Sequence, residues 1–183
     1  AYWDDQGYVT RSGSRTAWCA DMGADGGTAG TDNYPDNMNA WAVYGPFDLS
    51  SCSDAYLEFL LWLNCESGYD EFFVGASTNG SNYSGWNKSG DYSADGWGEE
   101  VLDLTSYCGQ SQVWIAFNFE SDGSINAEGA YIDDVVISLN SSGGVDDLYE
   151  ENDTLGTAYA FGEQTWLSSI NGLGVQADDD WYE

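Results

Sequence analysis

Short apolar runs bounded by turn-forming residues constrain the fold of this chain more than any other feature. No window keeps apolar residues at the i, i+3, i+4, i+7 spacing of an amphipathic helix for long. The run at 112–120 alternates apolar residues on one face, and the run at 55–64 is the strongest candidate for a central strand. This pattern predicts an all-β fold, an antiparallel jelly roll or β-sandwich. The candidate strands lie at 16–20, 39–44, 55–64, 71–77, 100–104, 112–120 and 130–139.

Charge is the second constraint. The chain of 183 residues carries 32 acidic side chains, three basic ones and no histidine, for a net charge of -29. Repulsion on this scale destabilises a compact chain, so we expect bound cations or concentrated salt to offset it. Three basic residues cannot neutralise nucleic-acid phosphates, and an anionic membrane would repel the chain. Aromatic residues make up 16%, whereas disordered acidic chains are poor in them, so we expect a folded protein.

The missing histidine also argues against catalysis. It excludes Ser-His-Asp and Cys-His nucleophile systems, H-E-x-x-H zinc hydrolysis and Cys/His zinc fingers. Ser-Lys chemistry would depend on Lys88 alone. Paired carboxylates could still perform glycosidase chemistry, but no single pair stands out from the 32 candidates. We therefore expect that this chain is not an enzyme.

Composition divides the chain into a large and a small part. We expect a β-sandwich over 1–139, a Gly/Ser linker at 140–145 and a partial second β module at 146–183. The last part offers three short strand-like pieces, too few to be stable alone, so either the chain is a fragment or another chain completes the sheet. No apolar run is long enough to span a membrane. The chain begins at Ala1 without a signal peptide, which favours a mature or trimmed form.

Four cysteines favour disulfide bonds and an oxidising, extracellular location. No C-x-x-C motif is present, and a zinc site without histidine would need all four thiolates. Four cysteines allow three connectivities. Cys52 and Cys108 follow similar D-L-S/T turns, so we expect them to pair, which leaves Cys19 with Cys65.

Two sets of sequence segments are informative beyond their composition. Those of the first part are SGSRTAWCAD, NMNAWAVYGPFDLS, AYLEFLLWLNCESGYDEFFVGASTNG, VLDLTSYCGQSQVWIAFNFESDG and GAYIDDVVI, and those of the second are DDLYEENDTLGTAYAF and QADDDWYE. With the first set, residues 1–139 resemble the MAM-like jelly-roll domain of immune-inhibitor-A-type peptidases. With the second, residues 146–183 resemble the first half of the bacterial pre-peptidase C-terminal domain. The resemblance implies accessory, non-catalytic modules of secreted bacterial proteins.

Clustered acidic residues suggest calcium, because Ca²⁺ takes hard oxygen ligands from within a loop. One such loop contains Asp21, Asp25, Asp32 and Asp36. It does not meet the EF-hand pattern, and a hydrated surface loop is the alternative. If Cys19 and Cys65 were bonded, Glu66 and Asp70 could share an ion with this loop.

The family resemblance implies two further calcium sites. In similar jelly rolls, the first Asp of the Y-I-D-D-V-V-I motif binds calcium with an acidic residue of the first strand and carbonyls of the following turn. These positions match Asp133, Asp4 or Asp5, and the turn at 11–13; the alternative is that Asp133 and Asp134 are hydrated edge residues. In modules related to the second part, the matching positions are Glu151, Asn152, Asp153, Asp178 and Asp180.

Tryptophans are candidates for carbohydrate stacking, because a flat ring presents an apolar face to a sugar. Trp86 and Trp97 lie in Gly-rich turns, where core packing is less expected; packing over the sandwich edge is the alternative. Tryptophans in the strand-like runs are expected in the core. They are Trp18, Trp41, Trp62 and Trp114.

These observations favour a calcium-stabilised, extracellular accessory module of a secreted multidomain hydrolase, most simply a peptidase. Its expected partners are the other domains of that protein and a protein or glycan surface. Two alternatives stay open. One is a carbohydrate-binding module. The other is a structural subunit of an extracellular fibre or surface layer, completed by strand addition from another copy.

Overall fold

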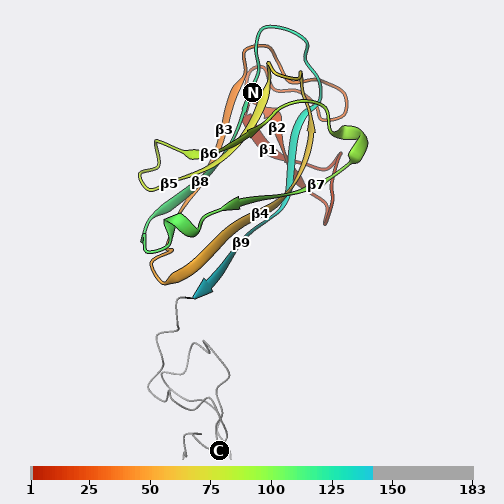
Figure 1. Ribbon diagram of the computed structural model, residues 1–183. Coiled ribbons are helices and arrows are strands. Elements are labelled where there is room, and N and C mark those ends of the chain that lie inside the picture. Colours follow the sequence, from red (N-terminus) through yellow and green to blue (C-terminus); the bar gives the residue numbers. More distant parts are fainter. Residues whose placement is uncertain (1, 142–183) are drawn as a thin grey trace, which may run out of the picture.

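The described part of the chain is a sandwich of two antiparallel sheets. The structure, a computed structural model, describes residues 2–141 (Figure 1). One sheet has the order β1-β2-β9-β4-β7 and the other the order β3-β8-β5-β6. The strands are β1 (Tyr2–Gln6), β2 (Thr16–Met22), β3 (Asn39–Phe47), β4 (Cys52–Asn64), β5 (Glu71–Ser77), β6 (Ser84–Lys88), β7 (Gly98–Asp103), β8 (Val113–Glu120) and β9 (Gly129–Ser141).

These strands confirm the predicted all-β fold. All seven predicted runs are strands, and the only helices among residues 2–141 are the short 3₁₀ turns η1 (Ser93–Asp95) and η2 (Thr105–Tyr107). The apolar runs did not indicate β1 and β6, each of which forms one edge of its sheet; the opposite edges, β7 and β3, were predicted. No helix of the described residues is long and apolar enough to cross a membrane.

Alternating apolar side chains build the core between the sheets. In β8, Val113, Ile115, Phe117 and Phe119 are all buried, as the sequence pattern predicts. Phe59 of β4 meets Phe117 edge-on, with ring centroids 5.1 Å apart, and so joins the two sheets. Burying such large apolar surfaces is the main favourable contribution to folding.

One edge of β9 is open in its second half. β2 pairs with β9 only through Ile132 and Tyr131, whereas β4 pairs with β9 as far as Ser141. Asp134, two residues after the last β9 residue that pairs with β2, has a left-handed φ of 49°. From there on, β4 is the only strand of the described residues beside β9. An apolar groove of about 330 Å³ lies against this half; it is lined by Tyr44, Phe47, Ile115, Val135 and Ile137.

The predicted domain boundary falls at the limit of the described residues. β9 continues to Ser141, two residues beyond the predicted run at 130–139. The rest of the linker and the module at 146–183 lie outside the described residues, so this division of the chain stays a prediction.

The cysteine pairing is half correct. Cys52 and Cys108 form the predicted disulfide. The expected Cys19–Cys65 bond is wrong, because both residues are buried free thiols. Each sulfur has its own backbone partners: Cys19 accepts a hydrogen bond from the Ala130 N–H, and Cys65 accepts one from the Gly90 N–H. Burial raises the pKa of Cys19 to about 12.

The free thiols give a test by chemical labelling. At pH 8 a thiol-specific reagent should react slowly with the folded protein, because burial raises the pKa of both Cys19 and Cys65 and the thiolate is the reactive form. Unfolding in denaturant without a reductant should then expose two thiols per chain. Peptide mapping that found a Cys19–Cys65 disulfide, with no thiol released, would contradict the structure.

Candidate metal centre

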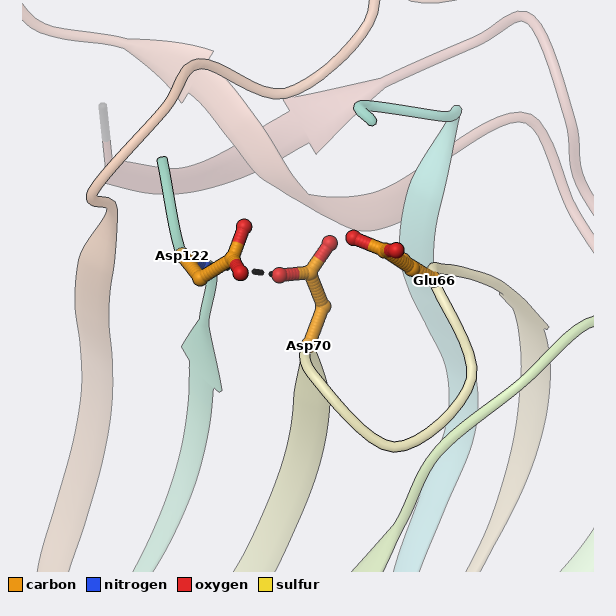
Figure 2. A group of neighbouring side chains, drawn as sticks. All are labelled: Glu66, Asp70 and Asp122. Atoms are coloured by element: carbon orange, nitrogen blue, oxygen red, sulfur yellow. Dashed lines mark hydrogen bonds between the residues drawn. The ribbon is translucent and has the colours of Figure 1, made fainter. Parts of the chain in front are cut away.

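Three carboxylates meet at one end of the sandwich. Glu66 and Asp70 lie on the loop between β4 and β5, and Asp122 lies just after β8. Each offers an oxygen within 4.8 Å of the others. Figure 2 shows the three side chains directed toward a common point between their loops. Among residues 2–141 this is the only group of three or more such ligands brought so close together.

Strand pairing explains why residues so far apart in sequence meet. Glu71 and Glu120 are opposite each other at the end of the β5–β8 ladder. The residues just before β5 and just after β8 therefore lie side by side. The Asp122 N–H donates a 2.8 Å hydrogen bond to Asp70 Oδ1, drawn as the dashed line in Figure 2. The sheet thus fixes the spacing of these two carboxylates.

Asp70 is the most confined member of the cluster, with a fully buried side chain (0% exposed). Its Oδ2 accepts a hydrogen bond from the Tyr34 hydroxyl. Burial, and then this bond, raise the pKa of Tyr34 far above its usual value, so the hydroxyl keeps its proton and donates. A buried carboxylate is costly unless it is paired or hydrogen-bonded, and here backbone and tyrosine supply two donors.

Glu66 lacks such compensation. Its Oε2 is buried and has no hydrogen-bond partner among the described residues. Burial, followed by the charges of Asp122 and Asp70, raises the pKa of Glu66. The ion pairs of the described residues are Arg15–Asp5 and Lys88–Glu100, so no basic side chain offsets the cluster. A cation bound here would remove both the repulsion and the unpaired oxygen.

The oxygens present define what the cluster can do. Three carboxylates and a neighbouring phenolic hydroxyl are hard oxygen donors, the type preferred by Ca²⁺ and Mg²⁺, and the set contains no imidazole or thiolate. The cluster can therefore hold a divalent metal ion. Because it ties together the β4–β5 loop, the end of β8 and the Tyr34 segment, an ion here would cross-link three stretches of chain.

The structure brings together only part of the predicted second cluster. Glu66 and Asp70 do meet, but their third carboxylate is Asp122, and the 21–36 loop contributes Tyr34 instead of an aspartate. The pKa of Asp21 is raised, first by burial and then by the negative charges of Asp4 and Asp5. Asp25 and Asp36 are exposed, and Asp32 accepts a hydrogen bond from the Thr28 N–H.

Asp133 has backbone partners. Its Oδ2 accepts hydrogen bonds from the N–H groups of Arg11 (2.8 Å) and Ser12 (3.2 Å), so the turn named by the family resemblance does lie beside it. Asp4 Oδ1 accepts a hydrogen bond from the N–H of Asp5. Asp5 forms an ion pair with Arg15, with 3.3 Å between Oδ2 and Nη1. Calcium binding by this set stays a prediction. The set with Glu151, Asn152, Asp153, Asp178 and Asp180 lies outside the described residues.

Asp122 is the member of the carboxylate cluster that the sequence analysis did not identify. The signal was present, because Asp122 lies two residues after the strongly alternating strand β8, and Asp70 directly precedes the strand β5. Using that signal requires knowing that these two strands pair with Glu71 opposite Glu120.

Both tryptophans predicted as sugar-binding candidates are partly buried and pack against the core, and carbohydrate binding by them stays a prediction. Trp86 stacks on Phe59 at 6.2 Å between centroids and donates its indole N–H to the Val101 carbonyl. Trp97 packs partly against the core and lines a cleft of about 270 Å³ with Lys88, Tyr92 and neighbouring acids. The prediction that Trp41 lies in the core is wrong, because its side chain is 45% exposed.

The sequence of this chain is similar to short segments of two peptidases. Bacillopeptidase F of Bacillus subtilis is 36% identical over 119 residues, which is 64% of this chain and 8% of that protein. The pre-pro-metalloprotease PrtV of Vibrio cholerae is 30% identical over 109 residues, 53% of this chain and 12% of that protein. The chain thus spans only a small part of these relatives. No protein-family model matches it, so the MAM-like and pre-peptidase assignments stay predictions.

A solved structure supports the fold. The K2 cleaved adhesin domain of Lys-gingipain aligns with a TM-score of 0.52 at 13% identity, over 75% of this chain and 83% of that one. At this identity the likeness concerns the β-sandwich architecture alone.

The pKa of Glu66 gives a test in the absence of metal. Its folded-state pKa lies above the usual value of 4.5, so the folded state binds this proton more tightly than the unfolded chain. Without metal, stability should therefore fall as the pH rises from 4.5 through the raised pKa. In chelator at neutral pH, Glu66→Gln should melt at a higher temperature than the wild type.

The exposed Glu99 provides the control, because Glu99→Gln removes the same charge away from the cluster. If both variants changed the melting temperature equally at every pH, the effect would come from net charge and not from the cluster.

Proposed function

We propose that this chain is a non-catalytic accessory module of a secreted, multidomain peptidase, stabilised by Ca²⁺ at Glu66, Asp70 and Asp122. The observation that carries the proposal is the buried Asp70 carboxylate with two further carboxylates beside it and no basic partner among the described residues. The relatives support the context, because their names identify peptidases and the matched segment is a small part of each. The histidine-free composition supports a role outside catalysis.

Calcium is favoured over other ions by ligand type and by geometry. Ca²⁺ accepts irregular sets of about six to eight oxygens, whereas Mg²⁺ demands near-octahedral geometry and keeps most of its waters. The three carboxylates come from two segments, the β4–β5 loop and the segment after β8, and waters or carbonyl oxygens would complete such a set. An extracellular location fits this choice, as does the Cys52–Cys108 disulfide. Other domains of the same polypeptide are the expected partners.

Calcium binding should raise the melting temperature of the protein, and a chelator should reverse the rise. A ligand at about 100 times its Kd stabilises the folded state by about 2.7 kcal/mol. Asp122→Asn should abolish most of the calcium-dependent rise in melting temperature, because it removes a negative charge from the cluster. The substitution keeps the size of the side chain and one of its oxygens, so it disturbs the packing little. Calorimetry in sodium chloride, with and without calcium, separates specific binding from screening.

Matched variants assign the effect to a site. Asp36→Asn removes one charge from an exposed loop position and should leave the calcium response intact. If Asp133→Asn lost the calcium-dependent rise in melting temperature and Asp122→Asn kept it, the ion would bind at Asp133, the site implied by the family resemblance. The absence of any calcium response at low salt would refute the proposal.

Assembly by strand addition is a second candidate, favoured by the open edge of β9 beside the apolar groove. Unpaired strand edges are templates for pairing with another chain. In sedimentation experiments, self-assembly should appear with rising protein concentration and should be weakened by Ile137→Lys. A monomer at all concentrations, in calcium and in high salt, would exclude it.

A further inference from the structure

The outer face of the four-stranded sheet carries a group of aromatic side chains that the core does not use. Trp41 of β3 is 45% exposed and contacts Phe73 of β5 and Tyr83, which directly precedes β6, at ring-centroid distances of 6.0 and 5.6 Å. We call Trp41, Phe73 and Tyr83 the aromatic platform. Neither neighbour is parallel to Trp41, since the interplanar angles are 60° and 40°. The Trp41 indole N–H donates to no other described residue.

Strand register explains how the platform forms. Trp41 and Phe73 are both paired with Asn118 of β8, one from each side, and Phe73 is also paired with Asn87 of β6. These four residues therefore make a row across all four strands. Gly75 lets the Phe73 ring lie flat along β5, because a Cβ at Gly75 would come within 2.4 Å of that ring.

Polar side chains surround the platform in a connected network. Asn118 donates to Asn39 Oδ1 at 2.9 Å, and Asn39 donates to Glu120 Oε1 at 2.6 Å. On the other side, Asn87 donates to Glu71 Oε2 at 2.7 Å. Asn118 is buried, so its amide is held in place. Four side-chain oxygens accept no hydrogen bond from other described residues. They are Oδ1 of Asn118 and of Asn87, Oε1 of Glu71 and Oε2 of Glu120.

These groups line a shallow hollow of about 250 Å³, made of Trp41, Glu71, Phe73, Asn87, Asn118 and Glu120. The hollow offers the Trp41 and Phe73 rings beside several side-chain hydrogen-bond acceptors, among them that of the buried Asn118. A pyranose has the matching surface, with an apolar face of C–H groups and a rim of hydroxyls. We propose that this hollow binds a saccharide, stacked on Trp41 and hydrogen-bonded by the polar network.

Charge specifies the saccharide further. The hollow contains two carboxylates and no basic side chain, and the whole chain carries a net charge of -29. Glycans bearing carboxylate or sulfate groups would be repelled, so the ligand is a neutral glycan. This assignment rests on the accessory role proposed above and adds a ligand class to it. It also moves the sugar site from Trp86 and Trp97 to Trp41.

Titration with neutral oligosaccharides tests this proposal. The probes are the hexasaccharides of cellulose, xylan, mannan and chitin, followed by calorimetry and by NMR of the labelled indole N–H groups. At least one probe should bind and shift the Trp41 indole signal. Trp41→Ala should weaken binding about tenfold or more, as for other central aromatic contacts, and Trp41→Tyr should retain most of it.

Controls separate this site from the others. Tyr44→Ala removes a more exposed aromatic ring (72%) from the same strand, and it should not change the affinity. Binding lost in Trp97→Ala but kept in Trp41→Ala would place the sugar in the Trp97 cleft and overturn the proposal. So would the absence of binding by any probe at about 10 mM, a limit of very weak affinity. The calcium response is measured on the same samples, so failure of sugar binding is distinguishable from failure of the metal centre.

Discussion

The buried carboxylate of Asp70 is the constraint on which the end of this sandwich depends. A charge removed from water must be compensated locally, because distant charges cannot offset its lost hydration. Here the Asp122 N–H and the Tyr34 hydroxyl satisfy its two oxygens. Both donors come from segments far from Asp70 in the sequence. The requirement to satisfy one carboxylate thus holds three stretches of chain together.

The same region shows how the acidic composition is organised. The net charge of -29 is a global repulsion, but its effect on the fold is local. Asp133 is satisfied by backbone N–H groups and Asp5 by Arg15, whereas Glu66 has a buried oxygen without a partner. Among the described residues, the Glu66 oxygen without a partner thus lies beside the fully buried Asp70. That combination favours a cation there over general screening by salt.

Sequence patterns predicted the fold well where they reflect burial on one face. The β8 run alternates cleanly because one side of that strand faces the core, and it was located within one residue. The edge strands β1 (YWDDQ) and β6 (SGWNK) are short and polar, so they carry no comparable pattern. In β3, apolar residues occupy both faces, as NAWAV shows. Alternation alone could not tell that Trp41 faces outward while Ala40 is buried.

The site was only half predictable for a related reason. Glu66 and Asp70 are neighbours in the sequence, so their proximity is local. Asp122 joins them through the pairing of β5 with β8, and the register of that ladder is not encoded in either strand alone. The cysteines show the same limit, because Cys19–Cys65 was expected only as the pair left over from Cys52–Cys108. In the structure, each of these two sulfurs accepts a backbone hydrogen bond instead.

A crystal structure of the protein grown with calcium tests whether the carboxylate cluster binds the ion. We expect one strong peak of anomalous scattering at about 2.3 to 2.6 Å from oxygens of Glu66, Asp70 and Asp122, the distance typical of Ca²⁺ ligands. A well-ordered structure in which these three carboxylates surround only water, in the presence of excess calcium, would contradict this expectation.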